Sequence, residues 1–142
     1  MKKVLFVTGT RADFGKIKNL MSVIESLESF ELHVLVTGMH MMRRYGSTYL
    51  EVKKENYNNV YMTSNQNEGE PMSSVLGNTI AIMTRLVNAI SPDLIVVHGD
   101  RVEALAGATV GALNHILVCH IEGGELSGTI DDSIRHAISK WS

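Results

Sequence analysis

The residues best suited to acid–base chemistry gather between positions 120 and 132. Glu122 follows an apolar run, Ile116–Cys119, that is typical of a buried strand. Because alternate residues of an extended backbone share a face, His120 and Glu122 are expected to point the same way. Asp131 falls in the first turn of a predicted helix, and the turn before it contains the glycines Gly123 and Gly124. Carboxylates at such a strand end can donate and accept protons, so this stretch predicts a catalytic surface.

A second carboxylate occupies a similar position one strand earlier. Asp100 follows the apolar run Leu94–Val97 and a glycine, and Arg101 comes directly after it. Aspartate in this place could simply cap the next helix, because its side chain accepts backbone N–H bonds there. Capping and catalysis both remain open for Asp100.

The turn after the first apolar run has the features of a phosphate site. Gly9 precedes a predicted helix, with Arg11 and Lys16 near its start, and a helix N-terminus favours anions. The spacing matches neither the dinucleotide-binding pattern nor the phosphate-binding loop of nucleotide hydrolases. In the simpler alternative, Gly9 shapes a tight turn and Arg11 forms a surface ion pair with Asp13.

Metal chemistry has little support in the sequence. The candidate ligands are His98, Cys119, His120, Glu122 and His136. They show no CxxC or HExxH spacing, and the adjacent Cys119 and His120 would point in opposite directions on a strand. No metal and no cofactor are expected.

The elements that must position these residues alternate along the chain. Strands are predicted at 4–7, 32–36, 60–62, 94–97 and 116–119, and helices at 14–27, after the turn at 10–13, and at 48–55, 72–90, 101–114 and 130–141. The alternation of strands and helices predicts right-handed crossovers and a parallel, Rossmann-like sheet with helices on both faces. The polar strand ends, including Thr37–His40, then meet at one edge, where such sheets bind ligands.

Composition fits one globular domain and excludes some partners. The chain has 142 residues, of which 44% are hydrophobic and 20% charged, and its net charge is −2. Nucleic acid and anionic membranes are therefore not expected as partners. A single cysteine, Cys119, and the lack of a signal-peptide pattern favour the cytoplasm.

Several motifs together resemble a known family. The matching segments are Val7–Gly15, Val36–His40, Gly99–Arg101, His120–Glu125 and Ile134–Lys140. They are similar, in order and over essentially the whole chain, to the hydrolysing UDP-N-acetylglucosamine 2-epimerases of bacterial sialic-acid synthesis. The resemblance implies the N-terminal half of a GT-B fold, with residues 1–142 as a single domain and the C-terminal UDP-binding domain outside this chain.

The resemblance also implies a reaction and the residues that perform it. UDP is eliminated across C1–C2 of the sugar to give a glycal, and water then adds to release N-acetylmannosamine. Asp100, Glu122 and Asp131 match the family's acid–base and glycal-stabilising carboxylates, whereas Arg11 and Lys16 match its phosphate-side residues. The remaining expected substrate contacts are Gly9, His40, Arg101, His120, Gly123 and Gly124.

Three alternatives remain beside this reading. The substrate could be a UDP-diacetamido-trideoxy sugar of the legionaminic-acid pathway, or the chain could be a non-catalytic fragment. A non-hydrolysing epimerase is less favoured, because that group usually carries Thr-Arg-Pro-Glu where this chain has Thr10–Asp13.

Apolar surface left by missing segments would also favour a homo-oligomer.

Overall fold

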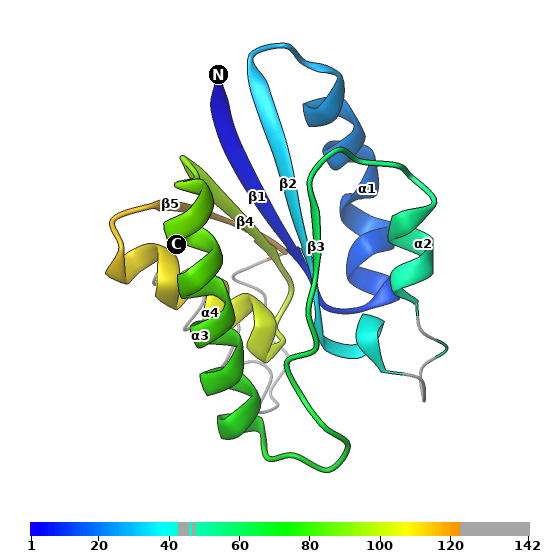
Figure 1. Cartoon of the computed structure of the whole chain (residues 1–142), viewed down its shortest axis with the longest axis vertical. Helices are drawn as coiled ribbons and strands as arrows, with labels where there is room; N and C mark the ends of the chain where they lie inside the picture. Colours follow the sequence, from blue (N-terminus) through cyan, green and yellow to red (C-terminus); the bar gives the residue numbers. More distant parts are fainter. Residues whose placement is uncertain (43–45, 47, 123–142) are drawn as a thin grey trace.

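The computed structural model describes residues 1–42, 46 and 48–122, which form one five-stranded sheet with helices on both faces (Figure 1). The order of strands is β3-β2-β1-β4-β5 and every pairing is parallel. The strands are β1 (Lys2–Thr8), β2 (Phe30–Val36), β3 (Val60–Met62), β4 (Leu94–His98) and β5 (Leu117–Ile121). The helices are α1 (Arg11–Ser26), η1 (Gly38–Met41, a 3₁₀ turn), α2 (Tyr49–Lys53), α3 (Met72–Ile90) and α4 (Val102–Leu113).

The central strands are buried on both faces, as expected for a parallel sheet. Alternate residues of β1 enter different clusters: Phe6 packs with α1 and α2, whereas Leu5 packs with α3 and α4. The apolar spacing of α1 and α3 serves this arrangement, since Ile17 and Met83 are both almost completely buried. The two helical layers therefore hold the sheet rigid from both sides.

Helix α4 lies very close to the sheet because two of its positions carry no side chain. A Cβ atom added at Gly107 would lie 2.6 Å from Cγ1 of Val97, and one at Gly111 would collide with Val118. The Ala- and Gly-rich composition of this segment indicates such an approach, and the structure confirms it. This close packing holds α4 against β4 and β5, so that the start of the helix lies next to the end of β4.

The strand order creates a crevice between β1 and β4. The chain runs outward from β1 to β3, then crosses back through α3 to place β4 on the other side of β1. Loops that leave the carboxyl ends of these two strands diverge to opposite faces, and this switch point is where open α/β sheets bind ligands. Helices α1 and α4 both begin there.

Most elements predicted from sequence are present, with one correction. Strand β5 was expected to be buried, but it is an edge strand in which Leu117 is 75% exposed and Cys119 is also exposed. Its apolar composition, which resembles that of the inner strands, gives no sign of this position. The predicted helix at 130–141 lies outside the described residues.

Candidate functional site

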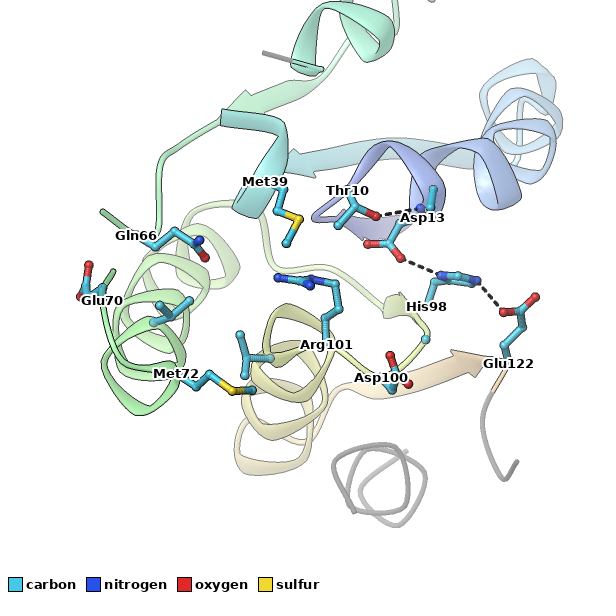
Figure 2. A pocket seen from close by; sticks show the side chains of 14 residues that line it. Thr10, Asp13, Met39, Gln66, Glu70, Met72, His98, Asp100, Arg101 and Glu122 are labelled. Atoms are coloured by element: carbon cyan, nitrogen blue, oxygen red, sulfur yellow. Dashed lines mark hydrogen bonds and ion pairs between the residues drawn. The ribbon is translucent and has the colours of Figure 1, made fainter. Parts of the chain in front are cut away.

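A cavity of about 690 Å³ opens at the switch point between β1 and β4. Its walls come from the start of α1, the turn after β4, the end of β5 and the segment around the start of α3 (Figure 2). The lining residues with polar groups are Thr10, Asp13, Gln66, Glu70, His98, Asp100, Arg101 and Glu122. The apolar side chains of Met39, Met72 and Val75 also line the cavity.

Three of the sequence-predicted residues line this cavity: Asp100, Arg101 and Glu122. They come from adjacent strands, because β4 and β5 are paired and end side by side. Capping of α4 is not the role of Asp100, since the N-cap position belongs to Arg101 and has no side-chain cap bond. Asp131, Gly123 and Gly124 lie outside the described residues.

Glu122 is held by contacts with Lys16 and His98. Its Oε1 accepts a hydrogen bond from Lys16 Nζ at 2.9 Å, and its Oε2 lies 3.1 Å from His98 Nε2. The Lys16 contact, with a further contribution from His98, holds the pKa of the Glu122 carboxyl below its usual range. The backbone here is left-handed, with φ of 61°, so the residue occupies a conformation that non-glycine residues rarely adopt.

His98 and Asp13 complete this cluster and were not predicted as site residues. His98 Nδ1 lies 2.9 Å from Asp13 Oδ1, and both residues are only 9% exposed. The alternative of a surface ion pair between Arg11 and Asp13 is wrong, because Asp13 is buried and faces His98. The available signals were a histidine at a strand end and an aspartate three residues after the cap Thr10.

Arg101 is fixed by a buried carboxylate that sequence reasoning also missed. Its Nε donates to Oε1 of Glu103 at 3.0 Å, and Glu103 is 2% exposed. Oε2 of the same carboxylate accepts from Asn65 Nδ2 at 3.2 Å. A single acidic residue in an otherwise apolar helix is the signal that could have identified it, since buried charges are paired.

The remaining predicted residues support the cavity or lie elsewhere. His40 is fully buried, and its ring nitrogens contact the hydroxyl oxygens of Thr8 and Thr48 at 2.8 and 3.0 Å. Burial lowers the pKa of the His40 imidazole. His120 Nε2 donates to the carbonyl oxygen of Gly99 at 2.7 Å, which ties the end of β5 to the turn after β4.

Gly9 and Arg11 are close in sequence, but they lie in different surroundings. Gly9 is packed under Glu103, whose Oε1 would lie 2.7 Å from an added Cβ. Arg11 instead lines a second cavity of about 370 Å³ beside α2, and Lys18 and Lys54 are also in its wall. The structure therefore does not bring Arg11 into the cavity that contains Asp100 and Glu122.

Neither a metal site nor a membrane-spanning helix is found within residues 1–42, 46 and 48–122. Within them, no group of three or more His, Cys, Asp or Glu residues has the arrangement of a metal site. The helices of the same part of the chain are too short or too polar to cross a bilayer.

Comparison with known proteins identifies the family. Residues 23–142 match the family model described as UDP-N-acetylglucosamine 2-epimerase. The chain belongs to this family. A UDP-N-acetylglucosamine 2-epimerase of Neisseria meningitidis is 64% identical over 142 residues, which are all of this chain and 38% of that protein. A UDP-N,N'-diacetylbacillosamine 2-epimerase (hydrolyzing) of Legionella pneumophila is 35% identical, again over all of this chain and 38% of its own length.

Solved structures of epimerases share the fold. A crystal structure of a Neisseria meningitidis UDP-GlcNAc 2-epimerase bound to UDP-GlcNAc superposes with a TM-score of 0.85. The match covers 99% of this chain and 38% of that one, with 23% sequence identity. The sheet thus corresponds to the N-terminal part of a GT-B-like epimerase fold, and the chain spans well under half the length of the relatives it matches.

Proposed function

We propose that this chain is the part of a hydrolysing UDP-N-acetylglucosamine 2-epimerase that holds the sugar and supplies acid–base groups. The observation that carries the proposal is the meeting of Asp100 and Glu122 in one cavity, from adjacent strand ends. Two carboxylates on neighbouring elements can reach different sides of a bound ring. An inversion at C2 requires this arrangement, since the proton leaves one face and returns to the other.

The charges of the cavity favour the sugar over the diphosphate as the group bound beside these carboxylates. Asp13, Glu70, Asp100 and Glu122 all line it, whereas Arg101 is the one Lys or Arg residue among the lining residues that the structure describes. A diphosphate needs several cationic or N–H partners. We therefore assign residues 1–142 to one domain and most of the diphosphate contacts to a second domain outside this chain.

The proposed reaction uses these groups in two half-reactions. A carboxylate accepts the C2 proton while the C1–O bond to UDP breaks, which leaves a glycal. Water then adds to C1 and an acid returns a proton to C2, which gives N-acetylmannosamine. Lys16 and His98 hold the pKa of the Glu122 carboxyl below its usual range, so this group is in the ionised form, which is the form able to accept a proton. Asp100 and Asp131 are the other proposed carboxylates.

Names of relatives support the hydrolysing assignment. The Legionella pneumophila relative and a 33% identical relative from Campylobacter jejuni are both named as hydrolysing 2-epimerases of diacetylbacillosamine nucleotides. The absence of proline from Thr10–Asp13 points in the same direction. These two relatives also make a UDP-diacetamido-trideoxy sugar the second candidate substrate.

Assembly and location form the last part of the proposal. Leu113 at the end of α4 and Leu117 in the edge strand β5 are 66% and 75% exposed, and exposed apolar patches commonly mark contacts between subunits or domains. We propose a cytoplasmic homo-oligomer. Light scattering of the complete protein should give a mass above that of one chain, and a monomer at every concentration would contradict the oligomer.

The function is tested by incubating the complete protein that carries this chain with UDP-N-acetylglucosamine and, separately, with UDP-N,N'-diacetylbacillosamine. We expect UDP and N-acetylmannosamine to form in equal amounts from the first. Glu122→Gln should reduce the rate by roughly 100-fold or more, the scale of a lost acid–base group. Near-normal turnover of that variant would remove Glu122 from the mechanism. Faster turnover of the second sugar would make it the substrate, and no UDP from either would contradict the proposed function and favour the non-catalytic alternative.

A further inference from the structure

One imidazole in the cavity wall lies between two carboxylates. His98 Nδ1 contacts Oδ1 of Asp13 at 2.9 Å, and its Nε2 contacts Oε2 of Glu122 at 3.1 Å (Figure 2). The His98 side chain is 8% exposed, whereas that of Glu122 is 40% exposed. Asp13, His98 and Glu122 therefore form a row of three contacting side chains. It runs from the buried Asp13 carboxylate through the buried His98 ring to the Glu122 carboxylate in the cavity wall.

The two contacts of His98 determine how many protons its ring must carry. Ionised carboxylates only accept hydrogen bonds, and a neutral imidazole has a single N–H. Both contacts are satisfied together only when His98 carries two protons. Consistent with this count, the contact with Asp13 raises the pKa of the His98 imidazole, against the opposite effect of burial.

Asp13 is firmly held in its place behind His98. Its Oδ2 accepts from the backbone N–H of Gly9 at 3.3 Å, and its own backbone N–H donates to Oγ1 of Thr10 at 3.0 Å. It also lies in the first turn of α1, where the helix dipole favours a negative charge. The ring of His98 is thus oriented by a carboxylate that is fixed through the backbone.

Glu122 needs such a partner more than an ordinary strand-end residue does. The peptide before it is tied down, because Gly99 N–H donates to the carbonyl of Ile121 at 3.0 Å. Its side chain, however, is 40% exposed, and its other partner is Lys16, whose side chain is 60% exposed. An exposed lysine contact holds a carboxylate weakly. The buried His98 contact is the one able to fix its orientation.

We propose that Asp13 and His98 form a positioning pair that anchors Oε2 of Glu122 and so fixes the orientation of this carboxylate in the cavity wall. The inference rests on the proposed function of the cavity and adds two residues to it. Neither residue needs to touch the substrate. Asp13 orients the ring, and the ring orients the reacting carboxylate.

Three substitutions separate the links of this row. Asp13→Asn keeps the shape but removes the charge behind the ring. His98→Gln places an amide N–H where Nε2 was, so it still reaches Glu122 but not Asp13. His98→Asn has the opposite reach, toward Asp13 only. His115→Gln is the matched control, because His115 is exposed on the turn after α4, away from the cavity.

The kinetic test is UDP release by the complete protein across pH 5–9. We expect Asp13→Asn and His98→Asn to lower kcat at least tenfold with KM within about threefold of the parent, the pattern of a group that acts in the transition state. His98→Gln should retain more activity than His98→Asn. The basic limb of the pH profile should move to lower pH in Asp13→Asn, since the ring loses its second proton more easily. Equal losses in both His98 variants, or an unchanged Asp13→Asn profile in a folded protein, would overturn the proposal.

A second measurement separates failure of this inference from failure of the function. Nitrogen-15 NMR of the His98 ring reports its protonation without any turnover. The ring should remain doubly protonated to higher pH in the parent than in Asp13→Asn. Identical titrations would overturn the positioning pair even in an active enzyme, whereas an inactive parent with the expected titrations would count against the proposed function alone.

Discussion

Glu103 offers the sharpest test of how the cavity is supported. Its two oxygens accept from two different donors, Arg101 Nε and Asn65 Nδ2. The amide of Asn65 cannot rotate to compensate, because its oxygen already accepts from the backbone N–H of Gly38 at 3.1 Å. Glu103→Gln therefore replaces one acceptor by a donor, and either orientation of the new amide leaves two donors facing each other.

Burial decides which of the two contacts is lost. Asn65 is 2% exposed, whereas the Arg101 side chain is 34% exposed and can turn toward water. The new amide oxygen should therefore face Asn65, and Arg101 should lose its fixed position. A lost hydrogen bond to a charged group costs about 1.5–3 kcal/mol, and partial exposure of Arg101 reduces that value. We expect about 1–2 kcal/mol, or a Tm lower by roughly 2–8 °C for a protein of this size.

Thermal unfolding followed by circular dichroism measures this difference. Glu28→Gln is the matched control, because Glu28 is exposed in the turn between α1 and β2. In a double-mutant cycle, Arg101→Met should cost less in the Glu103→Gln background than in the parent, with a coupling of about 1 kcal/mol. A Glu103→Gln protein within about 0.3 kcal/mol of the parent, or additive effects, would refute the buried network.

Two further predictions concern the packing and the pH dependence of stability. Gly107→Ala should destabilise the protein by roughly 1–3 kcal/mol, because the added Cβ would lie 2.6 Å from the stiff, buried Val97. Denaturant unfolding measures this loss of stability, and an unchanged midpoint would contradict the close approach of α4. His40 has a lowered pKa in the folded state, so the unfolded chain binds its proton more readily and stability falls as pH drops below about 6.5, by at most roughly 1.4 kcal/mol per pH unit. Unfolding at pH 5 and pH 7 should show a smaller loss in His40→Asn, and equal losses would contradict neutral, buried His40.

The fold could be predicted because each element has its own local pattern. Apolar runs such as Leu94–Val97 mark the strands, and the stripe through Met83 and Val87 marks α3. The position of each strand within the sheet could not be predicted in this way. The apolar run of β5 resembles an inner strand, yet Leu117 is exposed, since only the spatial order of strands decides which one lies at the edge.

The site was predicted in part for a similar reason. Asp100 and Glu122 stand at strand ends, where the topology alone brings residues together, and both line the cavity. Asp13 and His98 are 85 positions apart in sequence, and no local pattern indicates that they meet. Their contact depends on the crossover that places β4 next to β1. Arg11 follows a glycine turn as a phosphate ligand would, yet the direction of α1 turns it toward α2.

The most direct test of the central claim is the reaction of the complete protein with UDP-N-acetylglucosamine in deuterated water. Elimination and re-protonation by groups such as Glu122 and Asp100 predict N-acetylmannosamine with one deuterium at C2, together with one equivalent of UDP. Proton NMR and mass spectrometry of the product measure both. A product that retains the original C2 hydrogen, or an epimerised sugar still attached to UDP, would contradict the account.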